Sequence, residues 1–178
     1  MILYVMRHAE AVEGNETLQD EWRYLTEKGR ATAERMSTSI SKISPKKTRL
    51  TVTSPLTRAV QTAEIAAKKA CRRNIIVAST LLLPEADISE LVAYIKECGN
   101  AGRVMLVGHE PQVGSLVAAL LGCEDKPVSL KKGGCVALEL NPKKADKPAA
   151  FLWYLAPGKK CLTSFNKAFP GKCIHGEK

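Results

Sequence analysis

The sequence lacks long apolar runs, contains few aromatic residues, and has only three histidines among its 178 residues. Because a membrane-spanning helix needs roughly 18 or more consecutive apolar residues, we expect no membrane span and no membrane partner. No two of the six cysteines form a C-x-x-C pair, and most fall within apolar patterns, which indicates reduced, buried thiols. These absences predict a soluble, cytoplasmic protein.

Metal ligands are equally sparse. Cys161, Cys173 and His175 lie near one another in the sequence, but their spacing fits no standard zinc pattern and no fourth ligand is evident. We therefore predict neither a metal nor a cofactor.

The formal net charge of +9 is spread along the chain. The lysine-rich stretches have neither the interleaved aromatic residues of a single-strand binding platform nor a recognisable reading helix. The charge therefore favours a solvated lysine surface over a nucleic-acid site.

The length fits one domain with a sizeable core. We assign residues 1–157 to this domain. The basic tail, residues 158–178, has no clear hydrophobic period, and we expect an extra wrap or a partly mobile segment there.

Short β-rich runs alternate with helical patterns along most of the chain. We expect strands at residues 1–6, 51–53, 75–77, 104–107, 134–140 and 150–155, and helices at residues 26–43, 56–69, 88–96 and 111–121. Thr26 is a predicted N-cap, and Ser54 is a predicted cap that places Pro55 at the first helical position. This order predicts a three-layer α/β/α fold with a mostly parallel central sheet and an antiparallel edge.

Three of the predicted strands end in residues that suit phosphate chemistry. Arg7 and His8 follow the first strand, Arg58 follows the second after a short turn, and His109 follows the fourth. Ligands of open α/β sheets bind outside the carboxyl ends of the strands, so these four side chains could converge. Two guanidinium groups can hold phosphoryl oxygens in pairs, and a neutral imidazole beside them can act as a nucleophile. We therefore predict a phosphoryl-transfer site with His8 as the nucleophile.

Five sequence blocks in this order also resemble a known family. They are Met6-Arg7-His8-Ala9-Glu10, Asp20-x-x-Arg23-x-Leu25-Thr26-x-x-Gly29, Ser54-Pro55-x-x-Arg58-Ala59-x-Gln61-Thr62, Leu82-x-Pro84-Glu85 and Gly108-His109-x-Pro111-x-Val113. Together they resemble the histidine phosphatase superfamily, and in their spacing its short SixA-type phosphohistidine phosphatases, over roughly residues 1 to 156. Ala9 stands where the family's R-H-G signature has glycine.

The resemblance implies a phosphoglycerate mutase-like fold and a covalent phosphohistidine intermediate on His8. It also implies that Arg7, Arg58 and His109 bind the phosphoryl group. The implied substrate is a phosphorylated protein of the histidine-phosphotransfer type, and the product is inorganic phosphate.

Two carboxylates are candidates for the proton donor, and the sequence does not choose between them. Glu85 occupies the place of the acid in phosphomonoesterase relatives, whereas Asp20 lies in a segment that could fold over the site. Asp20 could equally be an ordinary loop charge. We also count Asp20 and Arg23 as candidate substrate-binding residues.

Two other functions fit part of the pattern. A small-molecule phosphomonoesterase or mutase could use the same residues, but only Ala86 and Asp87 separate Glu85 from the next predicted helix, which leaves no room for an inserted lid. A non-catalytic phosphate- or nucleic-acid-binding module would suit the net charge. The presence of all four site residues favours a catalyst, and the sequence does not specify the oligomeric state.

Overall fold

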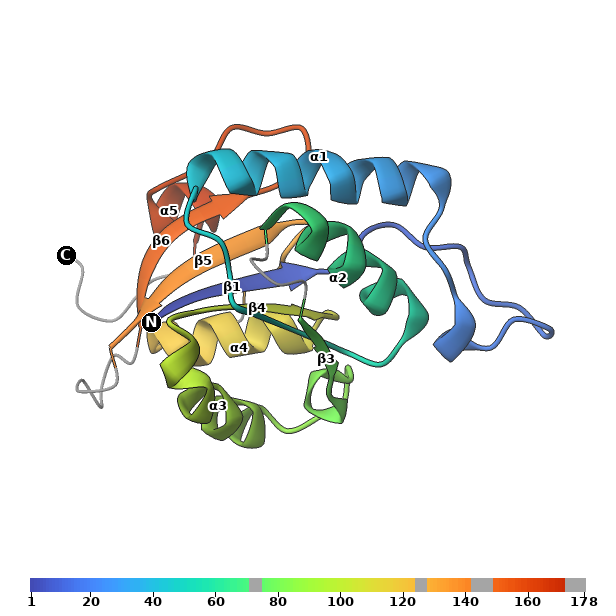
Figure 1. The fold of residues 1–178 in the computed structure, drawn as a ribbon, viewed down its shortest axis with the longest axis horizontal. Helices are drawn as coiled ribbons and strands as arrows, with labels where there is room; N and C mark the ends of the chain where they lie inside the picture. The colour runs from blue at the N-terminus through green and yellow to red at the C-terminus, as the bar shows by residue number, and fades with distance from the viewer. Residues whose placement is uncertain (71–74, 124–127, 142–148, 172–178) are drawn as a thin grey trace.

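The computed structural model describes residues 1–70, 75–123, 128–141 and 149–171. Its strands are β1 (Ile2–Arg7), β2 (Leu50–Thr53), β3 (Ile76–Ala78), β4 (Arg103–Gly108), β5 (Cys135–Leu140) and β6 (Ala149–Leu155). Its helices are α1 (Glu27–Ile43), α2 (Thr57–Ala70), α3 (Ile88–Glu97), α4 (Gln112–Leu121) and α5 (Phe165–Ala168), with short 3-10 turns at Asp20–Trp22, Thr80–Leu82 and Cys98–Ala101. Figure 1 shows this arrangement.

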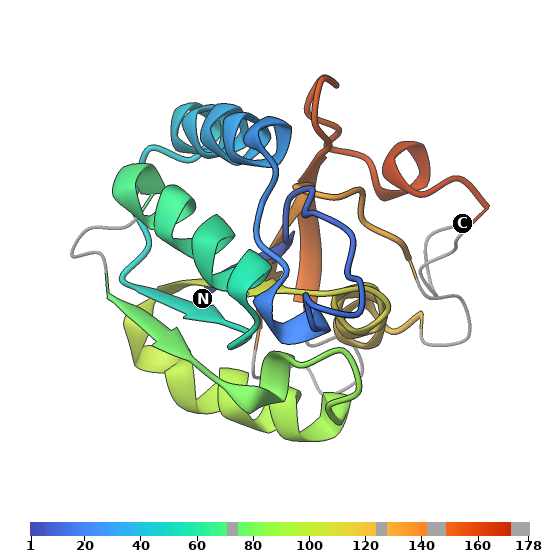
Figure 2. The same cartoon turned by 90° about the vertical axis from the view of Figure 1, so that its right-hand side faces the viewer.

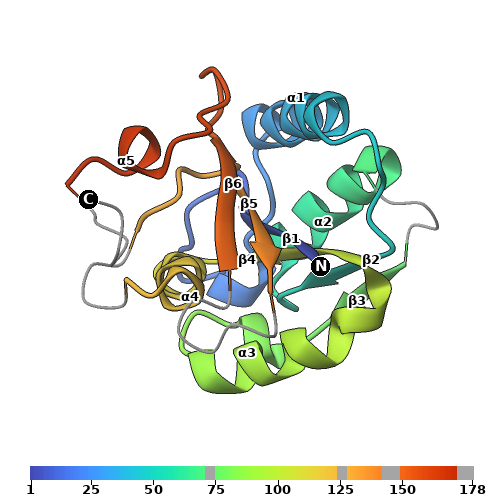
Figure 3. The same cartoon turned by 90° about the vertical axis from the view of Figure 1, so that its left-hand side faces the viewer.

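The strands form one sheet in the order β3-β2-β4-β1-β5-β6. The first four of these strands are parallel, and β5 and β6 add an antiparallel edge through the pairing of β5 with β1. Helices α1 and α2 cover one face, and α3 and α4 cover the other (Figure 3). The predicted three-layer fold with a mostly parallel sheet is confirmed.

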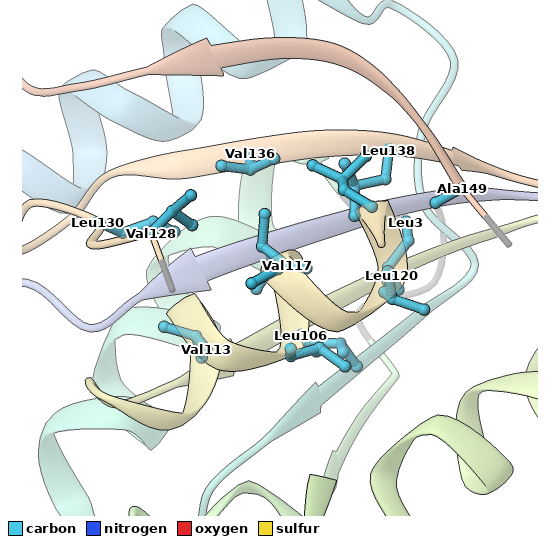
Figure 4. Packing of buried hydrophobic residues seen from close by; sticks show 14 of the residues in the cluster. Leu3, Leu106, Val113, Val117, Leu120, Val128, Leu130, Val136, Leu138 and Ala149 are labelled. Atoms are coloured by element: carbon cyan, nitrogen blue, oxygen red, sulfur yellow. The ribbon is translucent and has the colours of Figure 1, made fainter. Parts of the chain in front are cut away.

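Alternation along the buried strands sends side chains to both faces. Leu3 and Val5 of β1 pack in the core on the α4 side, whereas Tyr4 and Met6 pack in the core on the α1 and α2 side. Figure 4 shows Val113, Val117 and Leu120 of α4 against the first of these cores. A central strand covered on both faces needs apolar side chains at every position, which is why residues 1–6 read as one continuous apolar run.

The helix starts match the predicted ones closely, with one correction. The Thr26 hydroxyl accepts a hydrogen bond from the Gly29 amide at 2.9 Å, as expected of an N-cap. Pro55 is not the first helical residue, because the Leu56 carbonyl accepts the first intrahelical bonds and α2 begins at Thr57. Arg58 nevertheless remains in the first turn of α2.

Part of the predicted tail packs on the domain. Leu162 pairs with Tyr154 of β6 in an antiparallel bridge, and Phe165 and Phe169 are buried in the core on the α4 side. The predicted boundary at residue 157 stays a prediction, and residues 172–178 lie outside the described ranges.

The thiols differ from the expected pattern. Cys135 is buried within β5, but Cys98, at the start of the Cys98–Ala101 turn, and Cys161, in the connection after β6, are only partly buried. None of the three is in a disulfide. Cys71 and Cys173 are outside the described residues. In the described ranges, every helix is too short or too polar to cross a membrane.

Candidate functional site

The carboxyl ends of three neighbouring strands create the candidate site. Strand β4 lies between β2 and β1, with Gly108 paired to Arg7 and Val107 paired to Thr53. Figure 2 looks onto this edge of the sheet. Helices α1 and α2 leave to one face and α4 to the other, and such a change of direction opens a crevice at the strand ends.

His8 is held with one ring nitrogen bound and the other free to react. Its Nδ1 lies 2.7 Å from the carbonyl oxygen of Ala9. A carbonyl can only accept, so Nδ1 carries the proton and Nε2 keeps its lone pair. Burial, together with the charges of Arg58 and Arg7, lowers the pKa of His8 to about 4, against the opposing effect of this hydrogen bond. The ring is therefore a neutral nucleophile at pH 7.

The backbone around His8 is fixed from several directions. The amide of Gly133 donates to the carbonyls of Arg7 and His8, at 3.1 and 3.0 Å, from a backbone with φ of +79° that favours glycine. The amide of Ala9 donates to the Thr62 hydroxyl at 3.1 Å. This network ties the loop to α2.

The alanine at position 9 has a packing role. Its methyl group is fully buried in a small cluster with Ala11, Leu25 and Ala33. The site therefore accommodates a Cβ where the family signature has glycine.

Arg7 is anchored at one end of its guanidinium group. Its Nη1 donates to the Leu130 carbonyl at 2.8 Å, while its buried Nε has no partner. Buried polar groups are rarely left unpaired, so this Nε–H is a donor that a bound anion could satisfy.

Arg58 is buried, and Asp20 contacts it twice. Arg58 Nη1 donates to the Asp20 carbonyl, and Nη2 to the Asp20 carboxylate at 2.8 Å. A guanidinium group has five N–H donors, so these bonds leave donors for a phosphate. The segment that carries Asp20 thus folds over the site.

His109 has neither ring nitrogen bonded although only 2% of the residue is exposed. Its ring centroid lies 4.9 Å from that of His8. Burial, reinforced by His8 and Arg58, lowers the pKa of His109 to about 3, so the ring is neutral and retains one N–H to donate. A phosphoryl oxygen at this place would satisfy it.

Asp20 is not an isolated loop charge. Arg23 binds its other carboxylate oxygen at 2.9 Å and also reaches Glu13 and the Val12 carbonyl. Desolvation alone would raise the pKa of Asp20, but the hydrogen bonds from Arg58 and Arg23 outweigh it and lower the pKa. Asp20 is therefore ionised at neutral pH, which argues against it as the proton donor. Of the site residues that the structure describes, Asp20 is the one that Arg23 binds.

Glu85 stands apart from this network. It is exposed and makes no hydrogen bond or ion pair with any residue that the structure describes. Its loop is held by Gln112, whose side-chain amide donates to the carbonyls of Leu81 and Ala86 at 2.7 and 3.3 Å. A role for Glu85 as acid stays a prediction.

Two residues join the site that the sequence did not single out. The carboxylate of Glu110 accepts from the Leu130 amide at 2.9 Å and so supports the loop that holds Arg7. The position of Glu110 between His109 and Pro111 could have identified it as a site residue. The charge of Lys132 lowers the pKa of both His8 and Glu10. Nothing in the sequence distinguishes Lys132 from the other lysines.

In the described part of the chain, no three His, Cys, Asp or Glu side chains cluster as metal ligands would. Cys173 and His175, considered above as possible ligands, lie outside that part. Arg7, Arg58 and Lys132 place positive charge at the strand ends, which suits an anion.

Comparison with known proteins gives the chain's family. The profile described as histidine phosphatase superfamily (branch 1) matches residues 3–81. An uncharacterized protein of Picosynechococcus is 30% identical over 141 residues, which cover 78% of this chain and 84% of that protein.

Solved structures of the same superfamily also match this chain. The protein histidine phosphatase SixA complexed with tungstate aligns with a TM-score of 0.76 and 26% identity, over 88% of this chain and 97% of that one. The alpha-ribazole phosphatase of Shigella flexneri shares the fold at 16% identity and a TM-score of 0.66, over 92% of this chain and 96% of that one. The expected phosphoglycerate mutase-like fold is confirmed, and the chain belongs to the histidine phosphatase superfamily, within which it is of the SixA type.

Proposed function

We propose that this phosphatase removes the phosphoryl group from phosphohistidine on a protein, through a covalent phosphohistidine on its own His8. The observation that carries the proposal is the His8 ring itself. Its Nδ1 is bound to the Ala9 carbonyl, and the pKa is lowered to about 4, so Nε2 is an unprotonated nucleophile among phosphate-binding groups.

The first step exchanges one P–N bond for another. His8 Nε2 attacks phosphorus, and the bond from phosphorus to the substrate imidazole breaks. The departing nitrogen keeps the electron pair of that bond. Because the other nitrogen of the substrate ring carries a proton, the substrate leaves as a neutral imidazole. Arg7, Arg58 and His109 donate to the phosphoryl oxygens, whose charge they stabilise without needing to move.

The second step restores the enzyme. Water attacks phosphorus, the bond to His8 Nε2 breaks, and inorganic phosphate leaves. The low pKa of His8 favours its departure as a neutral imidazole. Since an imidazole is a better leaving group than an alkoxide, this chemistry needs less from a protein acid than ester hydrolysis does. That agrees with the exposed, unpaired Glu85.

Two observations support a protein-borne substrate. The connection from the Thr80–Leu82 turn to α3 is only five residues long, so no inserted lid encloses a small ligand there. Small ligands depend on such enclosure for affinity. The similar structure at 26% identity is named as a protein histidine phosphatase.

The test is a comparison of kcat/KM on a phosphorylated histidine-phosphotransfer domain, N-phosphoimidazole, sugar phosphates and phosphoglycerate. The proposal expects the phosphoramidates to be turned over more efficiently than every ester. If a small phosphomonoester is the better substrate, the esterase alternative replaces this proposal and Glu85 becomes the expected acid. Cytoplasmic localisation stays a prediction.

A further inference from the structure

The segment that crosses the candidate site presents two aromatic side chains to solvent. We call residues 12–25 the strap. Among the described residues, five large hydrophobic side chains are exposed, and the two aromatic ones, Trp22 at 65% and Tyr24 at 48%, both belong to the strap. Exposed tryptophan adds nothing to the core, whereas tryptophan and tyrosine often dominate the binding energy of protein interfaces.

Hydrogen bonds fix the ends of the strap, so the backbone that carries these two rings is held in a defined position. The Val12 amide donates to the Tyr24 carbonyl at 2.9 Å, and Arg23 Nε returns a bond to the Val12 carbonyl at 2.8 Å. The Leu25 amide is held by the Gln61 side chain of α2 at 2.8 Å. A partner that contacts a preordered loop loses less entropy than one that must first order it.

The strap also touches the phosphate site directly. Asp20 binds Arg58 through both its carbonyl and its carboxylate, and Trp22 follows two residues later in the same short turn. Figure 2 shows the strap in front of the carboxyl edge of the sheet. A protein whose phosphorylated histidine reaches Arg58 must therefore lie against the strap.

The charge of the strap differs from that of the whole protein. Residues 12–25 contain four acidic residues and one arginine, in a chain with a net charge of +9. Glu16 and Glu21 are exposed and have no ion-pair partner among the described residues. An acidic strap around two aromatic rings is complementary to an apolar surface flanked by basic side chains.

We propose that Trp22 and Tyr24, on the acidic strap, form the docking surface for the protein substrate and select phosphohistidines with apolar and basic neighbours. This inference rests on the proposed function. It assigns recognition of the protein to the strap and recognition of the phosphoryl group to Arg7, Arg58 and His109.

The experiment compares three phosphoramidates. Two are phosphohistidine peptides of equal length, one with leucine and lysine beside the phosphohistidine and one with serine and glutamate, and the third is N-phosphoimidazole. We expect wild type to prefer the leucine-lysine peptide to both others. Trp22→Ala and Tyr24→Ala should each lower kcat/KM on that peptide about fivefold or more, mainly through KM, and should change kcat/KM on N-phosphoimidazole less than twofold.

Ile43→Ala is the matched control, because Ile43 is an exposed hydrophobic residue at the far end of α1. This variant should keep the wild-type kcat/KM on all three phosphoramidates. Equal losses on the peptide and on N-phosphoimidazole, no loss on either, or a preference for the serine-glutamate peptide would overturn the docking surface while leaving the proposed function intact. Phosphoglycerate is assayed alongside as an ester; its hydrolysis without hydrolysis of any phosphoramidate would overturn both.

Discussion

The rings of His8 and His109 lie with their centroids 4.9 Å apart and their planes at 53°, in surroundings that keep both imidazoles neutral. The two rings nevertheless differ in one contact. His8 has its Nδ1 bound to the Ala9 carbonyl, whereas both nitrogens of His109 are unpaired. The His8 ring is oriented to attack, and the His109 ring has an N–H available for the phosphoryl group. The two histidines therefore have different roles.

Replacing the proposed nucleophile should abolish turnover. We expect His8→Ala to be inactive and wild type, quenched after brief exposure to substrate, to carry acid-labile, base-stable phosphate on His8. Peptide mapping of the quenched enzyme is the measurement. His109→Ala is the control, since it removes a donor but keeps the nucleophile and should still accept phosphate slowly. Stable phosphate on a serine or aspartate would contradict the assignment.

Arg58→Lys should be far more damaging than the retained charge suggests. A lysine ammonium cannot keep both bonds to Asp20 and also donate in pairs to a phosphate. Loss of one such donor in a buried site costs roughly 2.7 to 4 kcal/mol, or a hundred- to thousandfold in rate. Arg23→Lys is the matched control, because Arg23 contacts Asp20 from outside, and kcat should fall less than about tenfold. Similar rates for Arg58→Lys and wild type would place Arg58 outside the phosphate site.

Asp20→Asn should strengthen inhibition by inorganic phosphate. The amide keeps an oxygen acceptor for Arg58 but removes the negative charge beside the anion site, and one unit charge a few ångströms away is worth roughly tenfold in affinity. Steady-state inhibition by phosphate measures this, with Glu13→Gln, which faces Arg23 only, as the control. A fall in kcat of about a hundredfold or more would instead identify Asp20 as a catalytic acid.

The two neutral imidazoles should make stability depend on pH. In the unfolded chain a histidine has a pKa near 6.5, whereas the folded values are about 4 for His8 and about 3 for His109. Between these values the unfolded state binds more protons, so the free energy of unfolding should rise with pH from about 4 to 6.5 and these groups should add no slope above that. At about 1.4 kcal/mol for each histidine and each pH unit, the change between pH 4 and 6.5 should be at most about 7 kcal/mol.

Urea denaturation at a series of pH values from 4 to 8 measures this slope. His109→Gln should reduce it, because the variant has one buried imidazole fewer to protonate. The same slope in wild type and variant would show that His109 is not held neutral by the fold.

Removing divalent metals should leave activity unchanged, because Arg7 and Arg58 supply the positive charge that stabilises the phosphoryl oxygens. Vanadate, which mimics the trigonal-bipyramidal transition state, should inhibit. Assays with and without a chelator, followed by readdition of magnesium, test the first point. Activity that disappears with the chelator and returns with magnesium would refute it.

Much of the fold is local and was therefore predictable. The apolar run before Arg7 and the three-to-four spacing of Ala33, Met36, Ile40 and Ile43 are set by neighbours along the chain. The structure buries the first three of these helical residues, whereas Ile43, at the last position of α1, is exposed. The four proposed phosphate-site residues were also predictable. Parallel strands end at one edge of a sheet, so residues that follow them must gather there.

Other features depended on contacts between distant residues. The supports of Arg7, which are Leu130 and Glu110, come from segments more than 100 residues away in the chain. Such pairings leave no periodicity or spacing in the sequence.

The sequence by itself determined which chemical groups this protein brings to its site, because strand pattern and motif order suffice to place Arg7, His8, Arg58 and His109 at one edge. Only the tertiary structure decided their states. The carbonyl of Ala9 sets the His8 tautomer, burial sets both imidazole pKa values, and the folded strap brings Asp20 onto Arg58. The reason is that protonation, orientation and ion pairing depend on distances of a few ångströms between groups that the sequence separates, and only the packed fold fixes such distances.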